Sequence, residues 1–162
     1  MISNFFKAAC LFVLILFAVP LNSSAQSTSK YKCMVQMSSY MGDGAYIVIS
    51  LINPKGAYEK TLYVLGSDKK WYKTLKEWNK FYLKQPKISG ITGASVTAGD
   101  RSVSIIDIET SKINAGYKLR FESAVEDKNY NVKDVEVPLT AEGLSAKTEG
   151  SGYIRYVRFS AN

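Results

Sequence analysis

The chain has 162 residues and a formal net charge of +7 at pH 7, with 46% hydrophobic and 22% charged residues. This length and balance are typical of one globular domain with a buried core, and they exclude a disordered chain. Histidine is absent and only two cysteines are present. These counts exclude histidine-dependent catalysis, histidine-ligated metals, multi-cysteine zinc sites and a disulfide framework.

The first 25 residues have the pattern of a secretory signal peptide. Lys7 gives a basic start, and the apolar run Ala8–Leu21 is shorter than the about 20 residues that a membrane-spanning helix needs. Small residues at Ser23 and Ala25 complete the pattern. We expect cleavage after Ala25, which leaves an exported protein without a membrane span and with a single domain over residues 26–162. An uncleaved membrane anchor is the alternative.

Three strands are predicted in the first half of the mature chain. Alternation of polar and apolar residues predicts a strand at Tyr31–Met37, with Cys33 as a buried small hydrophobe. Tyr46–Ile52 is apolar at nearly every position, which predicts a central strand covered on both faces. Ala57–Leu65 is the third strand. Asp43 lies between two glycines, and we interpret it as a turn residue rather than a ligand or catalytic acid.

One amphipathic helix interrupts the strands. Trp71 and Trp78 share a helical stripe, Thr74 and Glu77 have the spacing of a capping box, and Pro86 ends the helix. We expect this helix to lie across an open end or edge of the sandwich, with the tryptophans burying it. The densest basic cluster of the chain surrounds it: Lys69, Lys70, Lys73, Lys76, Lys80, Lys84 and Lys87. We interpret the cluster as a solvated face, and a surface for anionic partners is the alternative.

Three more strands follow, over Val103–Glu109, Gly116–Val125 and 134–139, and Tyr153–Phe159 closes the chain. In Gly116–Val125, apolar residues alternate with charged ones, which is typical of a half-buried antiparallel strand. About seven short strands joined by turns predict a mainly β fold. We expect an antiparallel, immunoglobulin-like β-sandwich with one helix between strands. A closed arrangement of the strands is the alternative.

The segment between the helix and the next strand, residues 89–101, is rich in glycine and in hydroxyl-bearing residues and shows no strand period. It is predicted to be a loop. Its residues Thr92, Gly93, Ala94 and Ser95 resemble the acceptor motif of extracytosolic proteins that carry FMN on a phosphoester bond. A flavin transferase that depends on magnesium and uses FAD modifies such proteins.

The resemblance implies a role for each residue of this motif. Ser95 matches the hydroxyl that accepts FMN, and Thr92 matches the upstream hydroxyl. Gly93 and Ala94 leave room beside the hydroxyl for the transferase and the flavin. The sequence departs from the motif in two ways: the acceptor position holds serine rather than threonine, and no acidic residue stands just before the motif.

Longer segments resemble a bacterial family of predicted periplasmic proteins. They are, in order, residues 38–46, 71–78, 91–95 and 116–122. Members of the family are loosely labelled as relatives of flagellar hook-cap proteins, through a shared immunoglobulin-like module. They are often encoded near flavin transferases and near membrane proteins with peptidase-propeptide-like domains. The resemblance implies a periplasmic role in extracytosolic electron transfer or iron handling.

These observations favour an exported accessory protein of a flavin-linked redox or iron-handling system, with FMN attached at Ser95. A flavin transferase and a membrane redox protein are its expected partners. We expect no enzymatic activity, because the sequence offers no convergent acid–base pair, and no nucleic-acid binding, because no recognition motif accompanies the lysines. The alternative function is a protein-interaction module without a cofactor.

Overall fold

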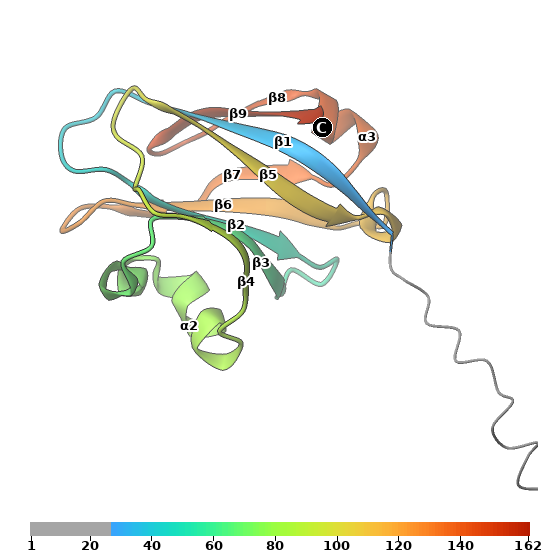
Figure 1. The fold of residues 1–162 in the computed structure, drawn as a ribbon, viewed down its shortest axis with the longest axis horizontal. Coiled ribbons are helices and arrows are strands. Elements are labelled where there is room, and N and C mark those ends of the chain that lie inside the picture. Colours follow the sequence, from blue (N-terminus) through green and yellow to red (C-terminus); the bar gives the residue numbers. More distant parts are fainter. Residues whose placement is uncertain (1–26) are drawn as a thin grey trace, which may run out of the picture.

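The structure is a computed structural model that describes residues 27–162. Two β-sheets stack face to face, and the helical segments lie outside the stack (Figure 1). The predicted mainly β sandwich is therefore confirmed, and the strands form two separate sheets rather than the closed alternative. The predicted signal peptide, with its cleavage after Ala25, lies outside the described residues.

The sheets have four and five strands. In spatial order, the four-stranded sheet contains β5 (Arg101–Glu109), β1 (Thr28–Met37), β9 (Ile154–Ala161) and β8 (Lys147–Glu149). The five-stranded sheet contains β4 (Ile88–Thr92), β3 (Tyr58–Leu65), β2 (Tyr46–Ile52), β6 (Lys118–Ala124) and β7 (Tyr130–Pro138). The helical segments are η1 (Lys69–Thr74), α2 (Lys76–Lys84), η2 (Thr110–Lys112) and α3 (Ala141–Ser145).

All seven predicted strands are present, and β4 and β8 are additional. The prediction of a loop over residues 89–101 is wrong at both ends, because Ile88–Thr92 forms β4 and Arg101 begins β5. This strand pairs with β3 in parallel, from Thr61 opposite Ile88 to Leu65 opposite Thr92. The other strand pairs within the described residues are antiparallel.

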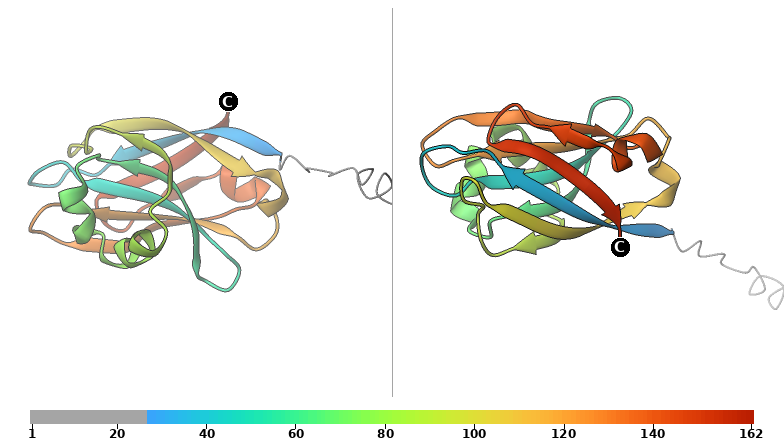
Figure 2. Two further views of the ribbon diagram at one scale, coloured as in Figure 1. Left: turned by 60° about the horizontal axis from the view of Figure 1, so that its bottom comes forward. Right: turned by 90° about the horizontal axis from the view of Figure 1, so that it is seen from above.

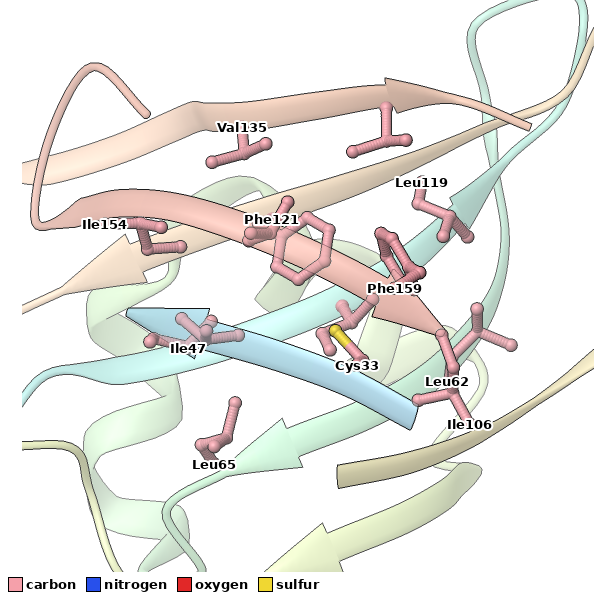
Figure 3. Close-up of a cluster of buried hydrophobic side chains, with 14 of the residues drawn as sticks. Cys33, Ile47, Leu62, Leu65, Ile106, Leu119, Phe121, Val135, Ile154 and Phe159 are labelled. Carbon is pink, nitrogen blue, oxygen red and sulfur yellow. The ribbon is translucent and has the colours of Figure 1, made fainter. Parts of the chain in front are cut away.

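A single apolar core fills the space between the sheets (Figure 3). Ile47 from β2, Phe121 from β6 and Ile106 from β5 are each at most 1% exposed. Cys33 is fully buried among them, and burial raises the pKa of its thiol far above the ordinary value. It is therefore an unreactive small hydrophobe, as predicted. Each large apolar side chain buried here stabilises the fold by about 1.5–3 kcal/mol.

Helix α2 covers the outer face of the five-stranded sheet (Figure 1). The expectation that it lies across an end or edge of the sandwich is wrong, because the outward side chains of this sheet are themselves apolar. Trp78 and Leu75 are fully buried against Val48 and Val64 of the sheet. The indole Nε1 of Trp78 donates a hydrogen bond to Thr61 Oγ1 at 2.9 Å. Trp78 thus holds the helix in place.

The predicted capping box at Thr74 and Glu77 does not form. Thr74 Oγ1 instead donates to the carbonyl oxygen of Trp71 at 2.6 Å, and the N-cap of α2 is Leu75, whose side chain cannot accept a hydrogen bond. The helix start is satisfied from the sheet below it. The backbone N–H of Glu77 donates to the hydroxyl of Tyr130, on β7, at 3.0 Å.

Beneath this helix start lies a buried carboxylate, Glu122 of β6, which is 0% exposed. The hydroxyls of Tyr58 and Tyr130 donate to its two oxygens, and the backbone N–H of Trp78 also bonds to it. Burial raises the pKa of Glu122 above its ordinary value, although these three hydrogen bonds oppose the rise. The carboxylate therefore links three strands to the N-terminus of α2.

Within residues 27–162, every helix is too short or too polar to span a lipid bilayer.

Candidate functional site

The four residues of the hydroxyl-bearing motif lie where β4 ends. Thr92 is the last residue of that strand, so it is fixed by sheet pairing rather than by a loop. Its carbonyl oxygen accepts a hydrogen bond from the N–H of Gly66 at 3.1 Å. The next carbonyl, of Gly93, accepts from Ser67 Oγ at 3.1 Å. The start of the motif is thus anchored to the residues that follow β3.

The residue after the motif is anchored to a different part of the fold. Val96 and Ala45 exchange both backbone hydrogen bonds, at 2.8 and 3.0 Å. The hydroxyl of Tyr40 sits on the same pair: it donates to the Val96 carbonyl at 2.9 Å and accepts from the Ala45 N–H at 3.0 Å. Burial raises the pKa of Tyr40, so the hydroxyl stays protonated as a donor.

Between the two anchors, residues 93–95 form a short bend. Gly93 and Ala94 are exposed, and a Cβ built on Gly93 would meet no atom within 4 Å. Ser95 is half-buried, and its hydroxyl has no hydrogen-bond partner in the part of the chain that the structure describes. The bend therefore presents small residues and an unpaired hydroxyl on a backbone that is held at both ends.

Gly44 is the neighbour that makes room for the hydroxyl of Ser95. A Cβ built on Gly44 would lie 2.4 Å from Ser95 Oγ and 3.0 Å from Ser95 Cβ, which is too close for real atoms. Sequence reasoning assigned Gly44 only to a turn around Asp43 and missed this contact. The sequence contains no signal for it, because Gly44 and Ser95 are brought together by the bridge between Ala45 and Val96.

The arrangement does not bring the two hydroxyls of the motif together as a pair. No hydrogen bond joins Thr92 and Ser95 in the described structure. A serine hydroxyl is a weak nucleophile unless a neighbouring base accepts its proton. No side chain of the described residues bonds to Ser95 Oγ, so none of them is placed to act as that base.

The two other features that the sequence singled out, Asp43 and the lysine cluster, form no hydrogen bond with the hydroxyl of Ser95 in the described structure. Asp43 is exposed in the loop between β1 and β2. The seven lysines around η1 and α2 are all exposed. Lys70 pairs with Asp68 at 3.1 Å and Lys80 with Glu77 at 2.7 Å, whereas the other five form no salt bridge within residues 27–162. Among the same residues, no group of three or more acidic or cysteine side chains is placed to hold a metal ion.

Comparison with protein-family models assigns the chain to a family. The model of a family described as predicted periplasmic protein, DUF2271, matches residues 28–156. The chain belongs to this family. The match covers β1 to β8, the first residues of β9, the helix on the outer face and the 92–95 bend. Its description supports the predicted periplasmic location. The searches of curated proteins and of solved structures found no significant match to the chain.

Proposed function

We propose that this periplasmic protein carries FMN covalently on Ser95 and acts as a non-enzymatic accessory of a flavin-linked redox or iron-handling system. The observation that carries the proposal is the unpaired hydroxyl of Ser95 on an exposed bend that is anchored at Thr92 and Val96. The sequence that leads into the bend, from Thr92 to Ser95, resembles a flavin acceptor motif. A rigid attachment point holds a redox group at a defined place on the surface without burying it.

The attachment reaction uses FAD as the donor of FMN. The oxygen of Ser95 attacks the phosphorus atom of the FMN half of FAD, and the bond from that phosphorus to the bridging oxygen breaks. AMP leaves with the bridging oxygen, and the hydroxyl proton passes to a base of the flavin transferase. The product is a phosphodiester between Ser95 and the ribityl chain of FMN, with no change of redox state.

The neighbouring residues fit this reaction. Gly93 and Ala94 project little or nothing from the bend, so a transferase active site can close over the hydroxyl. The main-chain bonds at Thr92 and Val96 limit the freedom of the bend, so little order is lost when the enzyme binds it. The flavin transferase and a membrane redox protein are the partners of this proposal.

Co-expression of the full chain with a flavin transferase tests the proposal by intact mass. We expect the exported chain to gain the mass of one FMN less one water, and the Ser95→Ala variant to gain nothing. The control is Thr97→Ala, which removes an exposed hydroxyl two residues further on and leaves the gain unchanged. An unmodified wild-type chain, or a gain that persists in Ser95→Ala, contradicts the proposal.

The second candidate function is a protein-interaction module without a cofactor. The observation that favours it is the set of exposed lysines around α2 that form no salt bridge within the described chain: Lys69, Lys73, Lys76, Lys84 and Lys87. Such a surface attracts acidic partners. A flavin-free protein from a host that contains an active transferase supports this candidate over the first.

A further inference from the structure

The edge of the four-stranded sheet formed by β5 is open. Strand β5 is the outermost strand of that sheet and pairs with β1 on one side (Figure 2, right). No strand of the described chain is hydrogen-bonded to its other side, although Lys60 of β3 forms a salt bridge with Glu109 at the end of β5, at 3.8 Å. An edge strand presents a row of main-chain donors and acceptors, which is a template for a strand from another chain.

The other three edges are protected in ways that β5 is not. Strand β8 has three residues and β4 has five. Strand β7 ends in Pro138, and its register with β6 shifts between Phe121 and Ser123. Strand β5, by contrast, has nine residues, contains no proline and pairs with β1 without a bulge from Arg101 to Glu109. Short length, proline and bulges are the usual protections of an edge.

The outward side chains of β5 are Arg101, Val103, Ile105, Asp107 and Glu109, and Glu109 forms salt bridges with Lys60 and Lys112. Val103 is 54% exposed and Ile105 is 41% exposed. The guanidinium of Arg101 donates to Gln36 at 3.1 Å, and neither Arg101 nor Asp107 forms a salt bridge with another described residue. A cation, two aliphatic residues and an anion thus follow one another on one face of the open strand.

We propose that β5 pairs antiparallel with β5 of a second copy of this chain, with Ser104 on the two-fold axis. In this register Arg101 lies opposite Asp107 of the second copy, and Val103 lies opposite Ile105 of the second copy. Each pair occurs twice by symmetry. The pairing joins the two four-stranded sheets into one continuous sheet, which supplies main-chain hydrogen bonds in addition to the side-chain pairs.

The side chains select this register over its neighbours. The pleat requires outward residues to face outward residues, so the axis moves by whole residues along β5. An axis at Ile105 sets Val103 opposite Asp107 of the second copy, and an axis at Val103 sets Arg101 opposite Ile105. Parallel pairing in register places each charged side chain opposite the same residue of the second copy, so like charges face each other. An axis at Ile105 also sets Arg101 opposite Glu109, but only the axis at Ser104 leaves no aliphatic residue opposite a charged one.

Charge reversal tests the proposal in the full exported chain by sedimentation over a concentration series. Arg101→Glu and Asp107→Arg each replace two attractive pairs with two repulsive ones, and we expect each to weaken the dimer roughly tenfold. The double variant restores the attraction and is expected to restore the dimer. Lys73→Glu, at an exposed site on η1, makes the same charge change as Arg101→Glu and should have no effect.

The results that overturn the proposal are a wild-type chain that stays monomeric up to its solubility limit, single variants that dimerise as the wild type does, or a double variant that is not rescued. Circular dichroism confirms that each variant is folded. A second test mixes Val103→Cys chains with Ile105→Cys chains under mild oxidation. The mixture should cross-link more than either variant alone, because directly opposed Cβ atoms lie about 4.5–5.5 Å apart; equal cross-linking overturns the register.

Discussion

The two outer faces of the sandwich differ in what covers them. The outer face of the five-stranded sheet carries apolar side chains such as Val48 and Val64, and η1 and α2 bury them together with Trp78. In the right view of Figure 2, no helix lies across the outer face of the four-stranded sheet. There Val103 and Ile105 are exposed beside charged residues.

This difference shows what a covering helix requires. Apolar burial supplies most of the attraction, but the exposed amides at the helix start also need acceptors. On the covered face, Glu122 and Tyr130 meet that need from strands β6 and β7. On the bare face, Lys32 and Arg158 project from the strands, and their charges keep the surface hydrated. The helix is therefore specified as much by the sheet beneath it as by its own sequence.

Removing the central side chain of the covered face should give the largest effect. Trp78→Ala leaves a cavity between α2 and the sheet and removes the hydrogen bond to Thr61, so we expect it to lower the free energy of unfolding by about 3–5 kcal/mol. Val103→Thr, on the bare face, should change it by less than about 0.5 kcal/mol. Urea denaturation at low protein concentration measures both. If Trp78→Ala lowered the free energy of unfolding no more than Val103→Thr does, the packing of the helix on the sheet would contribute little to stability.

A smaller effect is expected when one hydroxyl is removed from each face. Tyr130→Phe deletes a donor to the buried Glu122 and the acceptor for the N–H of Glu77, so it should lower the free energy of unfolding by about 1–3 kcal/mol. The matched variant is Tyr156→Phe, on the bare face, whose hydroxyl forms no hydrogen bond with the described chain. We expect denaturation to show no loss for it. A Tyr130→Phe protein as stable as the wild type would refute the role of Tyr130 at the helix start.

The smallest effect is a dependence on pH with opposite signs at two carboxylates. Burial raises the pKa of Glu122, so its ionised form disfavours folding, and this penalty fades as the pH falls toward the ordinary value of 4.5. Burial also acts on Glu136, but hydrogen bonds from Lys118 and Arg120 outweigh it and lower the pKa below 4.5. The stabilisation from Glu136 is therefore lost as the pH falls from 4.5 through its lowered pKa.

The two glutamine variants separate these contributions. Relative to Glu122→Gln, the wild type should gain stability as the pH falls from neutrality to about 4.5. Relative to Glu136→Gln, it should lose stability below that value. Thermal unfolding across the pH range measures both differences. A flat difference for Glu122→Gln would mean that the Glu122 carboxyl titrates alike in the folded and unfolded chain.

The strands were predictable because the polar and apolar residues of most strands alternate, or fail to alternate, according to which faces of the strand are buried. The alternation in β1 matches one face toward the core, and the unbroken apolar run of β2 matches a central strand buried on both faces. The expectation that β6 is half-buried with its charged residues outward is wrong, because Arg120 is 7% exposed and Glu122, beneath the start of α2, is 0% exposed. Strand β4 was not predictable in this way. It is short, contains a glycine and has exposed alternate residues, so β3 beside it defines it as a strand.

The surroundings of the candidate site depend on contacts between distant residues. Thr92 was assigned to a loop, but its pairing with Leu65 makes it the end of a strand. The space for the hydroxyl of Ser95 comes from Gly44, far away in the sequence. The capping box at Thr74 and Glu77 failed for the same reason, since a strand residue satisfies the helix start. Local spacing does not encode such partners.

The absorbance spectrum of the denatured, desalted protein, purified from the host that exports it with an active flavin transferase, tests the central claim most directly. The account predicts a flavin spectrum that remains with the unfolded polypeptide and disappears when Ser95 is replaced by alanine. A colourless polypeptide, or a flavin that separates from it on denaturation, would contradict covalent attachment at Ser95.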